Sequence, residues 1–500
     1  MQKTNSTLRS LILGSLVLMS FGTKAQNFIG LQHSNLSGIH QARLNPANIA
    51  DARQRLYVNG YTMGFGFNND YVQLDLPFSI FGFVQKNKVP SQYKTGNKIN
   101  FDNAWFTENL NGKSKNLNVY TEIRSPGAML KVTKVLSLGF QFRNMVSFQV
   151  SDVAEPLARL ARYGVDSTKG TTIYSGPNQF KIGDKFTDNK FAINFNSWGE
   201  LAGTIALRII NSNALKIKVG FTPKYLLGYM SGYVKNEGVQ FKIINNDSVI
   251  FEQTNLSYGY TEPTDFLNID PRNPIGFIKT KLKSGGFGYD AGFTFEYNPK
   301  ATKALTSQTN KYLVRGGISL LDGGSISYGS SMKSTTITGN SINKVFAVDA
   351  NMTAAFAKSK KDGILYVDSV AKTLFDINNS NGNVETKMPT TLNFQIDYNV
   401  LKILYVGANW SQDLLSKNIS GIRRPSYIIL IPRIETRLFE IAVPIGLMND
   451  YKTGRIGAFI RVGPVFIGTD NLVGQIRSSK YYGSDIYFGA STSIPSKKKK

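Results

Sequence analysis

Apolar and polar residues alternate with a period of two along most of the chain. The clearest example is residues 285–297, GGFGYDAGFTFEY, where one set of alternate positions is mostly aromatic and the other is small, polar or acidic. Successive side chains of a β-strand point to opposite faces, whereas a helix would scatter both sets round its circumference. The segment therefore predicts a β-strand, of about the length that a tilted strand needs to cross a bilayer.

The environment of the aromatic face decides the fold class. In a soluble sandwich this face would cover a core, whereas in an outer-membrane barrel it would contact lipid and the polar face would line a lumen. At residues 136–151 the alternation places Arg143 on the polar face, which is costly toward lipid but easy toward a wet lumen. The same pattern begins at residue 56 and recurs at residues 201–209, 215–221, 392–398, 404–410, 455–466 and 485–491.

The connections between these segments are uneven in length. Residues 211–213 form a tight turn, whereas residues 152–190, 231–283 and 330–389 are long and polar. Short turns at one end and long loops at the other are typical of outer-membrane barrels. In the first long loop, Asp152 as N-cap and Gly164 as terminator predict a helix. We therefore predict an all-β fold, a transmembrane antiparallel β-barrel over residues 56–495.

The N-terminus has the pattern of a secretory signal. Lys3 and Arg9 supply positive charge, residues 10–21 are apolar, and Thr23 and Ala25 suit signal peptidase. The apolar run is too short for a membrane anchor, so residues 1–25 are predicted to be a signal peptide. At the other end, residues 496–500 form a basic tail.

Residues 26–55 lack the strand alternation over most of their length. Short helices broken at Asn45-Pro46 are expected there, because proline interrupts a helix. The segment is either a cap over one end of the domain or a hatch that enters the barrel, and composition alone does not separate the two. We assign it as a hatch, with Asn45 and Pro46 as its marker residues.

Composition excludes several kinds of chemistry. The absence of cysteine rules out disulfides, zinc–thiolate sites and a cysteine nucleophile. Only His33 and His40 occur, both outside the predicted strands, so an outer-membrane enzyme with a histidine on the barrel is not expected. The net charge is +25, yet no nucleic-acid motif is present, and nucleic acid is not an expected partner. No metal or cofactor is expected.

The candidate site residues are charged residues on the polar faces of strands. They are either hydrated lumen residues that pair with each other, or a charged constriction or ligand-head site: Arg143, Asp290, Glu296, Arg315, Arg455 and Arg461. At Asp322-Gly323-Gly324 the alternation changes parity, which indicates a bulge or kink, or else a turn.

Several short motifs, each weak alone, occur in a characteristic order: residues 44–47, 122–126, 197–200, 286–299, 318–328, 463–471 and 483–489. With them the chain resembles an uncharacterised Bacteroidota outer-membrane β-barrel family, related to FadL-type fatty-acid transporters and to PorV of the type IX secretion system. The resemblance implies a barrel of about fourteen strands in the outer membrane of a Gram-negative bacterium. In FadL-like barrels a strand kink can open a lateral path through the wall, so Asp322 is a place to look.

Three functions are compatible with these features. The first is a FadL-like conduit for hydrophobic or amphipathic small molecules, which predicts an apolar pocket near the hatch. The second is a PorV-like binding or scaffold barrel for secretion or assembly proteins, which predicts a filled lumen and an exposed apolar patch on the loops. The third is a general porin with an open polar channel. The expected partners are outer-membrane lipid and lipopolysaccharide, together with the small molecule or the assembly proteins.

Overall fold

A computed structural model describes residues 28–78, 89–96, 98–100, 102, 105–163, 183–212, 214–245, 248–261, 284–299, 312–328, 332–339, 345–346, 369, 377–379, 385–416, 421–472 and 482–496. The predicted signal peptide and the four lysines of the predicted tail lie outside these residues. Within the described ranges, no helix has the length and apolarity to cross a membrane.

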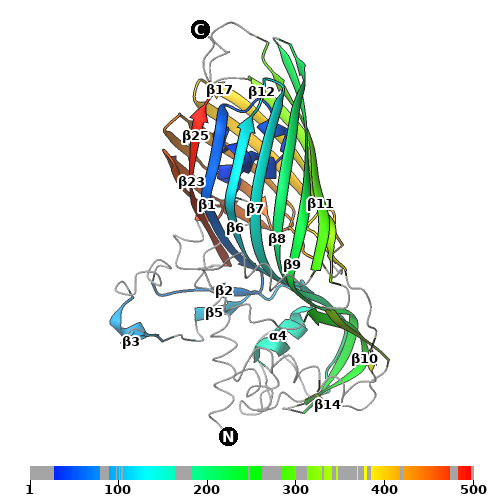
Figure 1. Cartoon of the computed structure of the whole chain (residues 1–500). Helices are drawn as coiled ribbons and strands as arrows, with labels where there is room; N and C mark the ends of the chain where they lie inside the picture. Colours follow the sequence, from blue (N-terminus) through cyan, green and yellow to red (C-terminus); the bar gives the residue numbers. More distant parts are fainter. Residues whose placement is uncertain are drawn as a thin grey trace.

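In the described part of the chain, fourteen strands close into an antiparallel barrel, which confirms the predicted fold class (Figure 1). Strand β1 pairs with β6 on one side and with β25 on the other, which closes the ring. Round the wall the strands are β1 (Gln54–Asn69), β6 (Lys115–Lys131), β7 (Leu136–Val153), β8 (Lys185–Asn211), β9 (Leu215–Asn245), β11 (Ser284–Tyr297), β12 (Val314–Ser327), β17 (Thr391–Leu401), β18 (Leu404–Asp413), β19 (Tyr427–Glu435), β20 (Phe439–Ala442) continued by β21 (Ile445–Met448), β22 (Thr453–Ile456) continued by β23 (Ala458–Val462), β24 (Val465–Thr469) and β25 (Gly483–Pro495).

The aromatic face of β11 points outward. Phe287 is 77% exposed, whereas Asp290 on the opposite face is 1% exposed. Exposed large apolar side chains continue round the exterior, including Phe140 on β7 and Ile396 on β17. A wall that is apolar outside and polar inside is the reverse of a soluble sandwich and is typical of a barrel in lipid.

The two ends of the barrel differ. The turns β6–β7, β8–β9, β17–β18, β19–β20 and β23–β24 lie at the end that carries the C-terminus, which we call the turn end. The opposite loop end carries a projecting part that contains β2 (Val72–Leu74), β5 (Phe106–Glu108), α4 (Glu155–Tyr163) and β10 (Ser248–Thr261) (Figure 1). The predicted asymmetry of the connections is therefore present, although the β21–β22 turn at the loop end is also short.

The segment 231–283 was predicted to be a long polar loop, and this is wrong for much of its length. Strand β9 continues to Asn245 and pairs with β10 (Ser248–Thr261) and with the start of β8. Val239, Phe241 and Ile243 are buried on one face of this extension. Only these three alternate positions form an apolar run, and polar residues flank them. A sheet outside the bilayer can expose one face to water, so the sequence here lacks the long apolar alternation that marks a membrane strand.

Smaller elements complete the loop end. Helix α4 (Glu155–Tyr163) lies where a helix was predicted, but Asp152, the expected cap, belongs to β7. Strands β2 and β5 pair beside a small apolar cluster that includes Phe78 and Trp105. The remaining elements there are β2 (Val72–Leu74), η5 (Ser91–Tyr93), β3 (Lys94–Thr95), β4 (Lys98–Ile99), β5 (Phe106–Glu108), β13 (Met332–Gly339), β14 (Val345–Phe346), β15 (Ile377–Asn379) and β16 (Glu385–Lys387).

Candidate gate in the barrel lumen

Residues 28–53, the described part of the predicted hatch, lie inside the barrel, and we call them the plug (Figure 1). The plug contains α2 (Ile29–His33) and the 3₁₀ helices η2 (Gly38–Arg43) and η3 (Pro46–Ile49). Every plug residue is buried except Leu36, which is half-buried. Gln54 and Arg55, which were predicted to belong to the hatch, begin strand β1 instead: Gln54 pairs with Pro495 on β25, and Arg55 lies at the register shift that follows.

Asn45 fixes the plug to the wall where its two 3₁₀ helices meet. Its side-chain oxygen accepts a hydrogen bond of 2.9 Å from the amide of Ala47 and so caps η3. Its side-chain nitrogen donates bonds of 3.0 Å to the carbonyl oxygens of Phe293 on β11 and Ile318 on β12. One asparagine therefore starts a plug helix and holds it against two neighbouring wall strands.

Two wall glycines make room for this contact. A Cβ atom at Gly220 on β9 would collide with the backbone of Pro46 and Ala47. One at Gly292 on β11 would collide with the side chain of Asn45. Because the plug backbone lies directly on the wall here, these positions accept glycine and exclude larger side chains.

A buried cluster of charges joins the plug to the wall. Arg43 donates bonds of 2.9 and 3.1 Å to the two carboxylate oxygens of Asp322 on β12, and one of 2.8 Å to Glu200 on β8. Lys224 on β9 lies 2.5 Å from both Asp290 and Asp322. Their side chains are between 0% and 5% exposed. Removing one partner from such a pair is costly because it leaves a buried charge without its counter-ion.

The same carboxylate is also reached from the loop end. Arg424, in the connection between β18 and β19, donates a bond of 2.9 Å to the Oδ2 atom of Asp322. Its neighbours hold this connection inside the lumen, since the amide of Arg423 donates to Gln149 at 2.9 Å and the amide of Gly421 to Asn194 at 3.3 Å. Asp322 is thus shared by the plug from one end and by residues 421–424 from the other.

The backbone at Asp322 departs from regular strand geometry. The β11–β12 register shifts between Tyr289 and Ala291, and Asp322 has a φ of 52°. Its amide donates a bond of 2.6 Å to the carboxylate of Asp290, and its carbonyl accepts one of 3.1 Å from the hydroxyl of Thr390. The wall contains a bulge here in which side chains replace part of the sheet hydrogen bonding.

A second group of contacts holds the plug on another part of the wall. Arg53 donates to Glu435 on β19 at 3.2 Å and to the hydroxyl of Tyr405 at 3.0 Å. The backbone amide of Asn35 donates a hydrogen bond of 2.9 Å to Glu435, and the hydroxyl of Ser34 donates one of 2.8 Å to Glu440. The plug is therefore attached to strands on several sides of the lumen.

All six predicted lumen residues face inward, and each pairs with a residue outside the predicted set. Arg143 and Asp290 lie in the cluster round Asp322. The remaining pairs are Glu296 with Lys218, Arg315 with Asp397, Arg455 with Asp485 and Arg461 with Glu440. Among the described residues no ion pair joins two of the six, so the sequence placed them on the correct face but not with their partners.

Four residues of the central cluster were not singled out from the sequence: Arg43, Glu200, Lys224 and Arg424. Glu200 and Lys224 lie on β8 and β9 and could have been found by their inward parity. Arg43 and Arg424 carry no such signal, because they lie in the plug and in a loop. At this level the charges are shielded from bulk water, because the plug covers them and Arg143 is 1% exposed.

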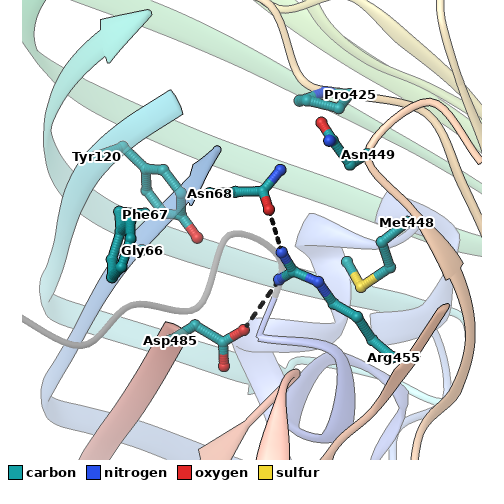
Figure 2. A pocket seen from close by; sticks show the side chains of 9 residues that line it. All are labelled: Gly66, Phe67, Asn68, Tyr120, Pro425, Met448, Asn449, Arg455 and Asp485. Carbon is teal, nitrogen blue, oxygen red and sulfur yellow. Dashed lines mark hydrogen bonds and ion pairs between the residues drawn. The ribbon is translucent and has the colours of Figure 1, made fainter. Parts of the chain in front are cut away.

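A small pocket lies on the loop-end side of the plug (Figure 2). Tyr120, Met448 and Pro425 give it apolar surface, and Phe67 lines it from a position of β1 with outward parity. Arg455 crosses it and binds Asn68 by a hydrogen bond and Asp485 by an ion pair of 3.7 Å. The remaining lining residues are Gly66 and Asn449. Within the described ranges, no group of three or more acidic or histidine residues is arranged to hold a metal ion.

Comparison with known proteins identifies a family. The model of a family of unknown function, DUF5723, matches residues 46–470, and the chain therefore belongs to that family. No curated protein matches the chain.

Solved structures with a similar course of the chain are remote. The P. putida toluene transporter TodX is 8% identical, with 93% of this chain and 95% of that chain covered and a TM-score of 0.32. A Pseudomonas aeruginosa FadL homologue is 9% identical, with 94% and 98% covered and a TM-score of 0.31. The CymD monoaromatic hydrocarbon channel is 6% identical, with 95% and 98% covered and a TM-score of 0.33. Likeness at this level carries no argument about what this chain does.

Proposed function

We propose that this member of the DUF5723 family is an outer-membrane β-barrel that conducts hydrophobic or amphipathic small molecules and is closed by its plug. The apolar exterior, the polar interior and the expected signal peptide support an outer-membrane location, with the turn end in the periplasm. The closed ring of strands supplies a wall, and the plug supplies a barrier that is a separate segment of the chain.

The shared contact at Asp322 carries this proposal. The plug and the inward loop close the lumen from opposite ends and bind the same carboxylate through Arg43 and Arg424. A purely structural plug is served as well or better by apolar packing, because buried ion pairs add little net stability. Charged surfaces, unlike apolar ones, are readily hydrated when they separate. A barrier held by ion pairs therefore exposes less apolar area when it opens than a barrier held by apolar packing, and its opening costs less free energy.

The pocket holds only about 20 Å³, room for about one water molecule, so an amphipathic ligand would have to widen it on entering. Small-molecule sites combine apolar walls with a few polar groups that fix orientation, and the pocket has both kinds of surface. Pro425 directly follows Arg424, so a ligand entering beside Pro425 would press on the residue that reaches Asp322. The bulge at Asp322 is the place in the wall where displacement of Arg43 and Arg424 would have its first effect.

Planar-bilayer recording of the mature protein beside a variant lacking residues 26–53 tests the proposal, since Gln54 already belongs to β1. The intact protein should be closed and the deletion variant should conduct. The deletion variant should also admit a hydrophobic fluorescent probe into vesicles faster than the intact protein. If the variant is folded and both proteins remain silent and exclude the probe, the lumen is filled independently of the plug, and the conduit proposal fails.

A binding or scaffold barrel remains the second candidate, because the lumen at the level of the plug is filled. It also requires an apolar docking patch on the loops. Among the described loop-end connections, the exposed large apolar side chains are Leu414 and Tyr451, which lie in different connections. This distribution favours the conduit. A general porin is least favoured, because the charges that would line its channel are buried against the plug.

A further inference from the structure

Among the described residues, the exposed charged side chains at the turn end of the barrel are all basic. The acidic residues beside the described turns are Asp51, near the end of the plug, and Glu435, the last residue of β19. Both are buried in ion pairs: Asp51 with Arg208 at 2.9 Å and Lys216 at 3.5 Å, and Glu435 with Arg433 at 2.8 Å. The exposed charged residues of the described rim are Arg55, Lys134, Lys402 and Arg437, which we call the basic collar.

The collar residues stand among exposed apolar side chains. Lys134 lies between Val132 and Val135, each 48% exposed. Lys402 lies between Leu401, 64% exposed, and Ile403, 44% exposed. In water such turns would leave apolar surface uncovered, whereas at the edge of a bilayer the apolar side chains enter the lipid. The long stems of Lys and Arg then carry their charges to the headgroups.

Arg437 repeats the arrangement in the β19–β20 turn, where the next residue, Leu438, is 71% exposed. The loop end differs, because acidic and basic residues are mixed along its connections. The collar is therefore a feature of one rim and does not follow simply from the excess of basic residues in the chain.

We propose that the basic collar binds the phosphate groups of anionic phospholipids in the leaflet that surrounds the turn end. The neighbouring apolar turn residues favour this partner over a soluble polyanion, since a soluble molecule would cover the charges and leave Leu401 and Leu438 in water. A cation near a membrane surface strengthens binding to anionic lipid roughly five-fold. The attraction falls as salt screens it.

Electron paramagnetic resonance of the mature protein in phosphatidylcholine vesicles tests the collar, with spin-labelled phosphatidylglycerol or spin-labelled phosphatidylcholine as the probe. The intact protein should restrict the anionic probe more than the neutral one. In the variant Lys134→Gln/Lys402→Gln/Arg437→Gln this preference should fall by roughly five-fold at each lipid site that loses a cation. Added salt should reduce the preference of the intact protein in the same direction.

The matched control removes three exposed lysines from the loop end, Lys113→Gln/Lys387→Gln/Lys452→Gln, and should keep the preference. Both variants have the same net charge, and their heat-modifiable mobility on gels reports folding. Equal loss of preference in the two variants would overturn the proposal, as would an unchanged preference in the collar variant. A collar variant that keeps the lipid preference but loses binding to soluble polyglutamate would identify a soluble acidic partner instead.

Discussion

Replacing Arg43 by Gln should loosen the plug without unfolding the barrel. The change removes two hydrogen bonds to Asp322, of 2.9 and 3.1 Å, and one of 2.8 Å to Glu200. Asp322 keeps Arg143, Lys224 and Arg424 as counter-ions. Because no wall carboxylate is left without a cation, the loss falls mainly on the attachment of the plug.

The magnitude follows from the burial of the pair. A hydrogen bond to a charged group contributes about 1.5–3 kcal/mol, and we take this range for the whole attachment, because the cations that remain at Asp322 and Glu200 compensate part of the loss. Each 1.4 kcal/mol is about a factor of ten in an equilibrium constant, so the ratio of open to closed barrels should rise by a factor between about ten and about a hundred. The remaining contacts of Asn45 and Arg53 still hold the plug, which keeps the increase finite.

Single-channel recording measures this ratio as the fraction of time spent open. The matched control is Lys224→Gln, which removes one positive charge from the same cluster but makes its ion pairs within the wall. We expect a clearly smaller increase for Lys224→Gln than for Arg43→Gln. If Arg43→Gln is folded and as closed as the unaltered protein, or if both variants open equally, Arg43 does not act as a latch.

Three further predictions concern the seat of the plug, the lipid-facing wall and the loop end. Gly220→Val should expel the plug and increase its cleavage by an added protease, whereas Gly203→Val, where a Cβ meets nothing within 4 Å, should not; equal cleavage would contradict the seat. Ile396→Arg, on the exterior at mid-strand, should lower the free energy of unfolding in lipid by about 2–4 kcal/mol, and Val400→Arg near the rim by about 0–1 kcal/mol; denaturant titration in vesicles measures both, and equal losses would argue against a membrane-embedded wall. At the start of α4, burial opposes ionisation of Glu155, but hydrogen bonds from Lys115 and from backbone amides outweigh it and lower its pKa. The ionised carboxylate therefore stabilises the fold above the ordinary pKa of a glutamate, and this stabilisation is lost as the pH falls through the lowered pKa. Acid should raise protease cleavage near α4, and this rise should be absent in Glu155→Gln.

The strand alternation was sufficient to predict the fold class and the direction in which most wall residues point. Phe287 and Asp290 illustrate this, since their exposure follows from parity alone. The extension of β9 past residue 231 was missed, because its short alternation lies among polar residues. Met145 is apolar at an inward position of β7, and only the structure shows that it packs in an apolar cluster with Tyr120 and Trp198.

The sequence by itself determined which side of the wall each strand residue faces, because in a barrel the surroundings of a side chain depend on its parity within one strand. Only the tertiary structure decided which charges meet. Arg43 precedes Asp322 by 279 positions, and Arg424, in a loop, follows Asp322 by 102 positions. Their meeting depends on the closure of the ring, on the register of its strands and on the path of the plug through the lumen. Local alternation records none of these three.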